Sequence, residues 1–130
     1  MQIARFISSD GPYLEALIEV DGQVLCVMDD FSPETGDLPP VGTRVALCFD
    51  SYVSDDDDWD DVFTGNPDQQ QGLVRLEGWR YRAYGRIVAI QPVMVDCGLL
   101  VVEDVIDTHD PRVIGAYVAF TIQRLTARPG

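Results

Sequence analysis

The sequence contains no lysine, so all nine of its basic residues are arginines, and it has a single histidine, His109. One histidine excludes a histidine cluster that could hold a transition metal. The glycine-rich phosphate loops, the zinc motif H-E-x-x-H and any motif that would place a Ser-His-Asp triad are also missing. His109 lies between two aspartates in "DTHDP" and is expected to be a solvated or loop-capping residue. We therefore assign no catalytic residue, no metal and no cofactor, and predict that the protein is not an enzyme.

Cysteine and long apolar runs are also scarce. The three cysteines, Cys26, Cys48 and Cys97, are an odd number without a C-x-x-C pair, and each lies in or beside an apolar run. This pattern predicts reduced, buried thiols in a cytoplasmic protein. The beginning of the sequence lacks the pattern of a signal peptide. No stretch approaches the roughly 18 apolar residues of a membrane span, so no membrane association is expected.

Acidic residues, by contrast, are abundant. The 130 residues include 22 Asp and Glu, which gives a formal charge of −13 at pH 7. A hydrophobic fraction of 46% is typical of a folding chain. The length fits one compact domain over residues 1–130. A surface of one dominant sign favours partners of the opposite sign and repels nucleic acid.

Alternation of apolar and polar residues predicts strands along most of the chain. In "YLEALIEVDGQVLCVM", Leu14, Ala16, Ile18 and Val20 are expected to face inward, Asp21-Gly22 to form a tight turn, and Val24, Cys26 and Met28 to continue the inward face. A second hairpin is expected to turn at 96–98, and Pro92 predicts an edge, a bend or a bulge. Further strands are predicted at residues 3–7, 43–52 and 116–125.

These elements together predict an all-β fold: a small antiparallel β-barrel or barrel-like sandwich of about seven to nine strands. Two segments also resemble each other, "VGTRVALCF" at residues 41–49 and "IGAYVAFTI" at 114–122. Each follows an alternating strand, "ALIEV" in the first half and "RIVAI" in the second. The chain is therefore interpreted either as two related halves of about 40 residues or as one barrel in which glycine-led strands recur independently.

The most acidic segment, "SYVSDDDDWDDVFTGNPDQQQG", is expected to form a surface loop over about residues 54–72. It lacks the alternating carboxylates, the glycine at the turn and the closing glutamate of a calcium loop. Either it is only a solvated loop, or its closely spaced carboxylates imitate phosphates while the tryptophan anchors a contact. The second interpretation assigns partner binding to Asp55, Asp56, Asp57, Asp58, Trp59, Asp60 and Asp61.

Arginines and aromatic residues interleave in "VRLEGWRYRAYGR". In an extended strand Arg80, Arg82, Tyr84 and Arg86 would share one face, and Trp79, Tyr81 and Ala83 the other. Guanidinium groups neutralise phosphates and rings stack on bases, so this face is a candidate site for a ligand or single-stranded nucleic acid. The alternative is that these arginines neutralise the acidic segment of the same chain.

The sequence thus leads to one main hypothesis and one alternative. The main hypothesis is a non-enzymatic acidic interaction protein that binds a basic partner protein, as an immunity or inhibitor protein against a cationic toxin or nuclease does. The alternative is a β-barrel that binds a ligand or single-stranded nucleic acid through its arginine and tyrosine residues.

Overall fold

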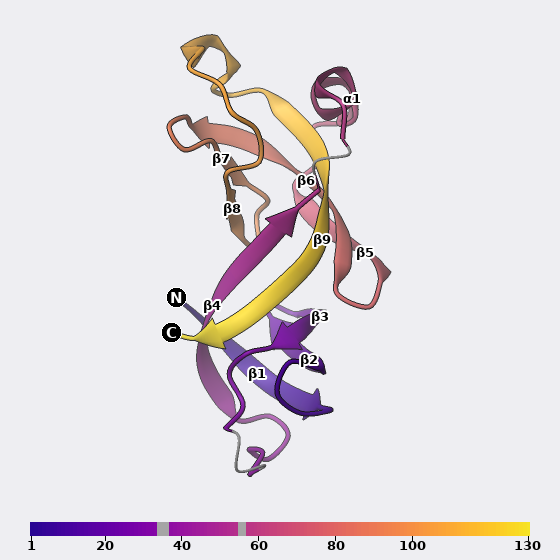
Figure 1. Cartoon of the computed structure of the whole chain (residues 1–130), viewed down its shortest axis with the longest axis vertical. Coiled ribbons are helices and arrows are strands. Elements are labelled where there is room, and N and C mark those ends of the chain that lie inside the picture. The colour runs from indigo at the N-terminus through magenta and orange to yellow at the C-terminus, as the bar shows by residue number, and fades with distance from the viewer. Residues whose placement is uncertain (34–36, 55–56) are drawn as a thin grey trace. The chain divides into compact units, whose positions relative to one another are not determined.

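The computed structural model describes residues 1–33, 37–54 and 57–130, and this part of the chain is almost entirely β (Figure 1). The prediction of an all-β fold is therefore confirmed. Nine strands belong to one mainly antiparallel hydrogen-bonded sheet. The elements are β1 (Gln2–Ser9), β2 (Glu15–Val20), β3 (Gln23–Asp29), β4 (Arg44–Val53), α1 (Trp59–Thr64), β5 (Gly72–Glu77), β6 (Arg80–Ala89), β7 (Met94–Asp96), β8 (Val101–Glu103), η1 (Pro111–Val113) and β9 (Tyr117–Pro129).

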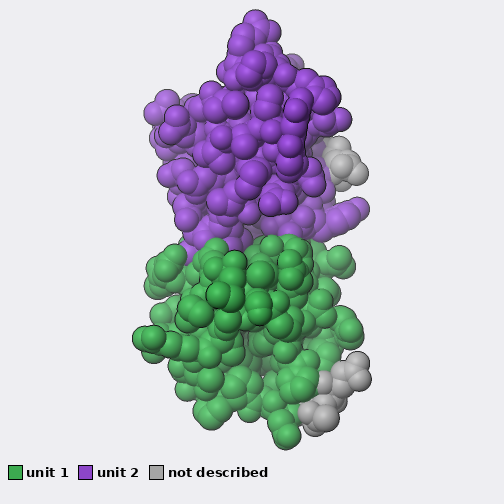
Figure 2. All heavy atoms as spheres, turned by 90° about the vertical axis from the view of Figure 1, so that its left-hand side faces the viewer, with its two compact units in different colours: residues 1–50, 75–80, 124–130 green, residues 51–74, 81–123 purple. Residues whose placement is uncertain are grey.

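The contacts divide the chain into two compact units, each built from segments that are separate in the sequence (Figure 2). Unit 1 contains residues 1–50, 75–80 and 124–130, and unit 2 contains residues 51–74 and 81–123. Strands β4 and β9 contribute residues to both. The single domain over residues 1–130 stays a prediction.

Five strands form a closed ring. They pair in the order β3-β2-β1-β4-β9, and a parallel pairing of Met28 with Thr126 joins β3 to β9. Closing a ring of strands leaves fewer open edges, which is how small β proteins avoid exposed backbone donors. The core of unit 1 is made of fully buried side chains from these strands, among them Ile18, Leu25, Leu47 and Leu125.

The hairpin of β2 and β3 forms as predicted, but the inward face of its second strand was predicted wrongly. Asp21 and Gly22, with φ of 49° and 82°, make a two-residue turn, so Ile18 lies opposite Leu25. Leu25 and Val27 therefore share the face of Ile18, whereas Val24 and Cys26, assigned to that face from the sequence, lie on the other one. Val24 is 55% exposed there, but Cys26 is buried as expected. A shift of one residue moves every side chain of a strand to the other face. Leu14, also expected inward, precedes β2 and is 52% exposed.

Unit 2 is built around β6, which pairs with β9 along one side and with β7 on the other. The expected bend at Pro92 is present: β6 ends at Ala89 and β7 begins at Met94. The second hairpin is also present, since β7 pairs with β8 and Gly98 has a φ of 81° in the turn between them. The core of unit 2 includes the fully buried side chains Tyr81, Ile87, Val95, Phe120 and Ile122. Strand β5, helix α1 and the 3-10 turn η1 were not predicted.

The two units repeat the same backbone pattern where a glycine precedes a long strand. Gly42, with φ of 89°, donates its N–H to the carbonyl of Phe6 at 2.7 Å. Gly115, with φ of 95°, donates to the carbonyl of Ile87 at 2.8 Å. In each case the backbone N–H of the same acceptor residue donates back to the residue after the glycine, at 2.8 Å and 2.9 Å respectively.

In both units the strand also changes register directly after the residue that accepts the hydrogen bond from the glycine. The β1–β2 register shifts between Phe6 and Ser8, and the β6–β7 register shifts between Ile87 and Ala89. Strand β4 pairs with β1, and β9 pairs with β6. The segment that matches "RIVAI" by position is therefore "RFISS" of β1, not "ALIEV" of β2.

Candidate functional site

Part of the acidic segment is a helix, although the whole of 54–72 was expected to be a loop. Helix α1 (Trp59–Thr64) follows Asp58, whose φ of −72° and ψ of 145° place it at the N-cap. Asp60 and Asp61 lie in the first turn, where carboxylates interact favourably with the helix dipole. Val62 is buried, so one side of the short helix packs against the protein.

The exposed residues at the start of α1 form an aromatic and acidic surface, here named the acidic helix face: Asp58, Trp59, Asp60 and Asp61. Trp59 is 46% exposed, and its ring stacks on that of Phe63 with centroids 5.5 Å apart and planes at 23°. This stacking of residues one helical turn apart holds the indole in place. Asp55 and Asp56, which were also assigned to partner binding, lie outside the described residues.

Asp57 differs from the aspartates that follow it, because its carboxylate is bound within unit 2. One oxygen, Oδ2, accepts a hydrogen bond from the backbone N–H of Thr121 at 2.6 Å, and Oδ1 lies 3.4 Å from Nη1 of Arg82. The side chains of Asp57 and Arg82 are 21% and 26% exposed. Asp57 therefore fastens the start of the acidic segment to β9 and β6, whereas Asp58 is exposed.

The end of α1 is also held close to the sheet. A Cβ atom on Gly65 would lie 2.7 Å from the backbone carbonyl of Asp61 and 3.0 Å from Cβ of Ala119, so a larger residue here would force the backbone to shift. Asn66 is 5% exposed; its Nδ2 donates to the carbonyls of Gln70 and Val118, and its Oδ1 accepts from the N–H of Gln70. The polar stretch after the helix thus begins with an ordered turn fixed to β9.

The alternation predicted for β6 is present. Tyr81 and Ala83 are buried at 1% and 0% exposure, and Arg80, Arg82, Tyr84 and Arg86 point away from the core. Trp79, expected to share the face of Tyr81 and Ala83, precedes the strand and lies in the β5–β6 turn. Arg80 belongs to unit 1, where it forms an ion pair with Glu77 at 3.0 Å.

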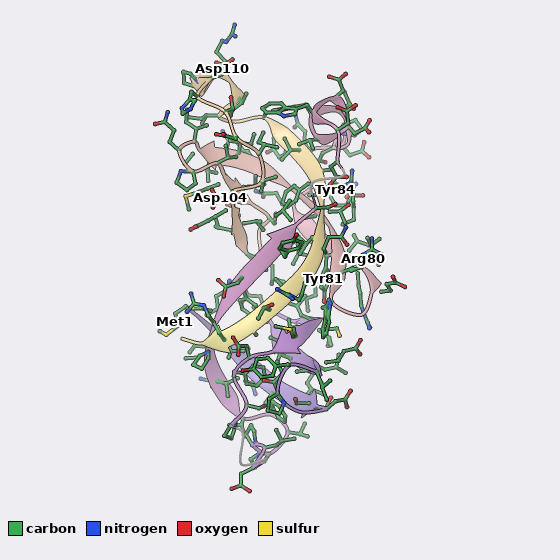
Figure 3. All side chains as sticks on the ribbon, in the orientation of Figure 1. Met1, Arg80, Tyr81, Tyr84, Asp104 and Asp110 are labelled. Atoms are coloured by element: carbon green, nitrogen blue, oxygen red, sulfur yellow. The ribbon has the colours of Figure 1, made fainter. Side chains whose placement is uncertain are left out.

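The remaining outward residues of β6 form one surface with their neighbours on β9, here named the arginine–tyrosine face. Thr121 lies opposite Arg82, and Tyr117 lies opposite Arg86. Tyr84 lies between these two positions in the register, opposite Ala119, and Figure 3 labels it on the part of β6 that runs beside β9. The side chains of Tyr84, Arg86 and Tyr117 make no hydrogen bond or ion pair with any residue that the structure describes. The face comprises Arg82, Tyr84, Arg86, Tyr117 and Thr121.

Two further features lie outside these surfaces, the single histidine and a hollow beside it. His109 is exposed, with Nδ1 2.6 Å from Nε2 of Gln91, beside a shallow polar hollow lined by residues 91–93 and 104–108. In residues 1–33, 37–54 and 57–130 no group of three or more His, Cys, Asp and Glu side chains is arranged to hold a metal ion. No helix in the same residues is long and apolar enough to cross a membrane.

The thiols are expected to differ sharply in reactivity. Burial raises the pKa of Cys97 to about 12, and burial, reinforced by Glu15, raises the pKa of Cys26. Cys48 is only partly buried. Because the thiolate is the reactive species, a thiol reagent at pH 8 should modify Cys48 alone in the native protein and all three cysteines in denaturant. Mass spectrometry of the modified protein will check this, and native labelling of Cys97 as fast as Cys48 would contradict it.

No match to this chain is found among protein-family models, curated proteins or solved structures. Its function is therefore inferred from the two surfaces described above, the acidic helix face and the arginine–tyrosine face.

Proposed function

We propose that the protein is a non-enzymatic interaction protein whose acidic helix face binds a basic partner protein. The observation that carries this proposal is Trp59, which is 46% exposed, fixed by stacking on Phe63, and surrounded by three exposed carboxylates. Exposed tryptophans that are held rigidly lose little conformational freedom on binding and are frequent interface anchors. The carboxylates would select a partner rich in arginine or lysine.

The charge of the whole chain supports the same partner class. Removing all seven aspartates between positions 55 and 68 would still leave a negative formal charge, so attraction of a basic protein does not depend on the helix alone. A field of one sign accelerates association, and the contacts at the interface then set the rate of dissociation. An immunity or inhibitor protein that neutralises a cationic toxin or nuclease would have this combination.

We further propose that the fold is a small barrel made of two related halves. We also propose that the protein is cytoplasmic. The closed ring of five strands supports a barrel. The matching glycine positions, hydrogen bonds and register shifts of β1–β2–β4 and β6–β7–β9 support a duplication. Three free cysteines are in keeping with a reducing compartment.

The arginine–tyrosine face supports a second candidate function, binding of a ligand or single-stranded nucleic acid. Tyr84, Arg86 and Tyr117 supply two rings and a guanidinium that have no partner in the described part of the chain. The charge of the protein opposes a polyanion at long range, so this function ranks second.

The test of the main proposal begins with capture of a partner on the immobilised protein at low salt, identified by mass spectrometry. Changing Asp58, Asp60 and Asp61 together to asparagine should then slow association and flatten its salt dependence, with the fold unchanged, because exposed like charges add little stability. Trp59→Ala should mainly speed dissociation, with a loss of affinity of about tenfold or more. Surface plasmon resonance separates the two rates.

The matched control replaces Asp10, Asp37 and Asp107 by asparagine, which removes the same charge from exposed sites outside α1. This control should change association much less than the triple change on the helix. A captured partner whose binding ignores both salt and the loss of the helix carboxylates would rule out the proposal.

A further inference from the structure

We propose that Arg82 and Thr121 form a phosphate-binding site that the carboxylate of Asp57 occupies, so that Asp57 blocks one end of the arginine–tyrosine face of its own chain. This inference does not rest on the basic partner proposed for the acidic helix face. Its test uses no such partner, so the two proposals succeed or fail separately.

The donors around Asp57 are those that bind an oxyanion. The backbone N–H of Thr121 donates to Oδ2 at 2.6 Å, and Nη1 of Arg82 lies 3.4 Å from Oδ1. The same Nη1 lies 3.2 Å from Oγ1 of Thr121, which keeps the guanidinium over this part of β9. A backbone N–H, a guanidinium and a hydroxyl on one small surface match the acceptor oxygens of a phosphate as well as those of a carboxylate.

The N–H of Thr121 is not used by the sheet, because it points away from β6 toward the segment on the other side of β9. On one side Thr121 lies opposite Arg82 of β6. On the other side its carbonyl accepts from the N–H of Ser54 at 2.9 Å, and its own N–H meets the side chain of Asp57 in place of a strand backbone. The carboxylate thus fills a position on β9 that another acceptor could take once Asp57 leaves.

The side chains next to this site are suited to bind the bases and the next phosphate of a nucleic-acid strand. Along β6, Tyr84 and Arg86 follow Arg82 at every second position on the same face, and Tyr117 lies opposite Arg86. Outward side chains on one strand repeat at about 6.6 to 6.8 Å, close to the reach of successive phosphates in an extended strand. The two tyrosines offer rings on which bases can stack, and Arg86 offers a second phosphate contact.

The experiment compares two variants that lose the same charge. Asp57→Ala vacates the site, whereas Asp61→Ala removes an exposed carboxylate of α1 that makes no contact with Arg82. At low ionic strength, Asp57→Ala should bind a fluorescent oligothymidylate at least about tenfold more tightly than Asp61→Ala, the gain expected for a charge-assisted hydrogen bond. Adding Arg86→Ala to Asp57→Ala should weaken binding and reduce the salt slope by about one. Fluorescence anisotropy measures both.

Competition with inorganic phosphate tests whether the site binds free phosphate or the phosphates of a single-stranded nucleic acid. Displacement of the oligonucleotide by phosphate, in amounts that matched chloride does not reproduce, assigns the site to free phosphate. Persistence of the complex assigns it to single-stranded nucleic acid held by the tyrosines. Asp57→Asn keeps an acceptor for the N–H of Thr121 and so protects the fold if the alanine variant unfolds. Because asparagine gives up the charge beside Arg82 but still accepts from this N–H, its gain over Asp61→Asn should be smaller than that of Asp57→Ala over Asp61→Ala. Equal oligonucleotide binding by Asp57→Ala and Asp61→Ala overturns the proposal.

Discussion

Replacing Asp29 by alanine is expected to lower the free energy of unfolding by about 3 kcal/mol or more. The side chain is fully buried at the end of β3, and its carboxylate accepts hydrogen bonds from the hydroxyls of Ser9 and Ser32 and from the N–H groups of Phe31 (2.9 Å) and Ser32 (2.8 Å). Alanine would leave all four donors without this acceptor in a site closed to water. Urea unfolding at neutral pH, followed by circular dichroism, measures the loss.

The same carboxylate makes stability depend on pH in the acid range. Burial disfavours its charge, but the hydrogen bonds from Ser32, Ser9 and Phe31 outweigh burial and hold the pKa of Asp29 below its ordinary value. A lowered folded-state pKa means that the stabilisation is complete above the unfolded-state pKa of about 3.9 and is lost as the pH falls through the folded-state value. The advantage of the wild type over Asp29→Asn should therefore be constant from neutral pH to about pH 5 and shrink below it.

Asp30, the exposed neighbour, provides the control for both measurements, because its replacement by alanine removes the same charge without disturbing these hydrogen bonds. An Asp29→Ala protein as stable as Asp30→Ala would show that the buried carboxylate contributes nothing to the fold. A stability difference between wild type and Asp29→Asn that does not change between pH 7 and pH 3 would contradict the proposed role of its charge.

Local patterns in the sequence were enough to predict most of the strands. Asp-Gly at 21–22 predicted the first hairpin because these residues adopt positive φ at little cost. The alternation of β6 predicted which side chains face outward, since every second residue of a strand lies on one face. The inward face of β3 was wrong because it depends on the number of residues in the turn, and a miscount of one moves every side chain.

Helix α1 could not be predicted from its own residues. Six residues form too short a helix to be stable alone, even with aspartates at its N-cap and in its first turn. Burial of Val62 holds the helix against the protein, and Gly65 closely approaches Ala119, a residue more than 50 positions away. A valine followed three residues later by a glycine was the one signal in the sequence, and it is too common to be informative.

The candidate site illustrates the same limit. Asp57 and Asp58 are identical neighbours, yet the first is bound to the sheet and the second is exposed. Their difference comes from Thr121 and Arg82, which are distant in the sequence. The sequence suggested that the arginines either bind a ligand or neutralise the acidic segment; Arg82 does contact that segment, whereas Arg86 does not contact any described carboxylate.

Phe120→Ala is expected to have the largest effect of any single substitution in unit 2, a loss of about 3 to 5 kcal/mol in the free energy of unfolding. Phe120 is fully buried on β9 and lies opposite Ala83 of β6, so the small partner leaves the ring to fill the space between the strands. Removing the ring loses its transfer free energy and leaves a cavity that closely packed strands cannot close. Urea unfolding measures this loss as a lower midpoint.

Thr121→Ala, at the next residue of β9, tests whether the lost stability comes from the ring of Phe120 or from release of the acidic segment. Thr121 faces outward and holds Asp57 through its backbone N–H, which remains in Thr121→Ala, so that variant should keep nearly all of the stability. Val101→Ala, at a site that is 50% exposed, should cost less than about 1 kcal/mol. If Phe120→Ala were no less stable than these two variants, the ring could not be the packing centre of unit 2, and the position of β9 against β6 would have to rest on backbone hydrogen bonds alone.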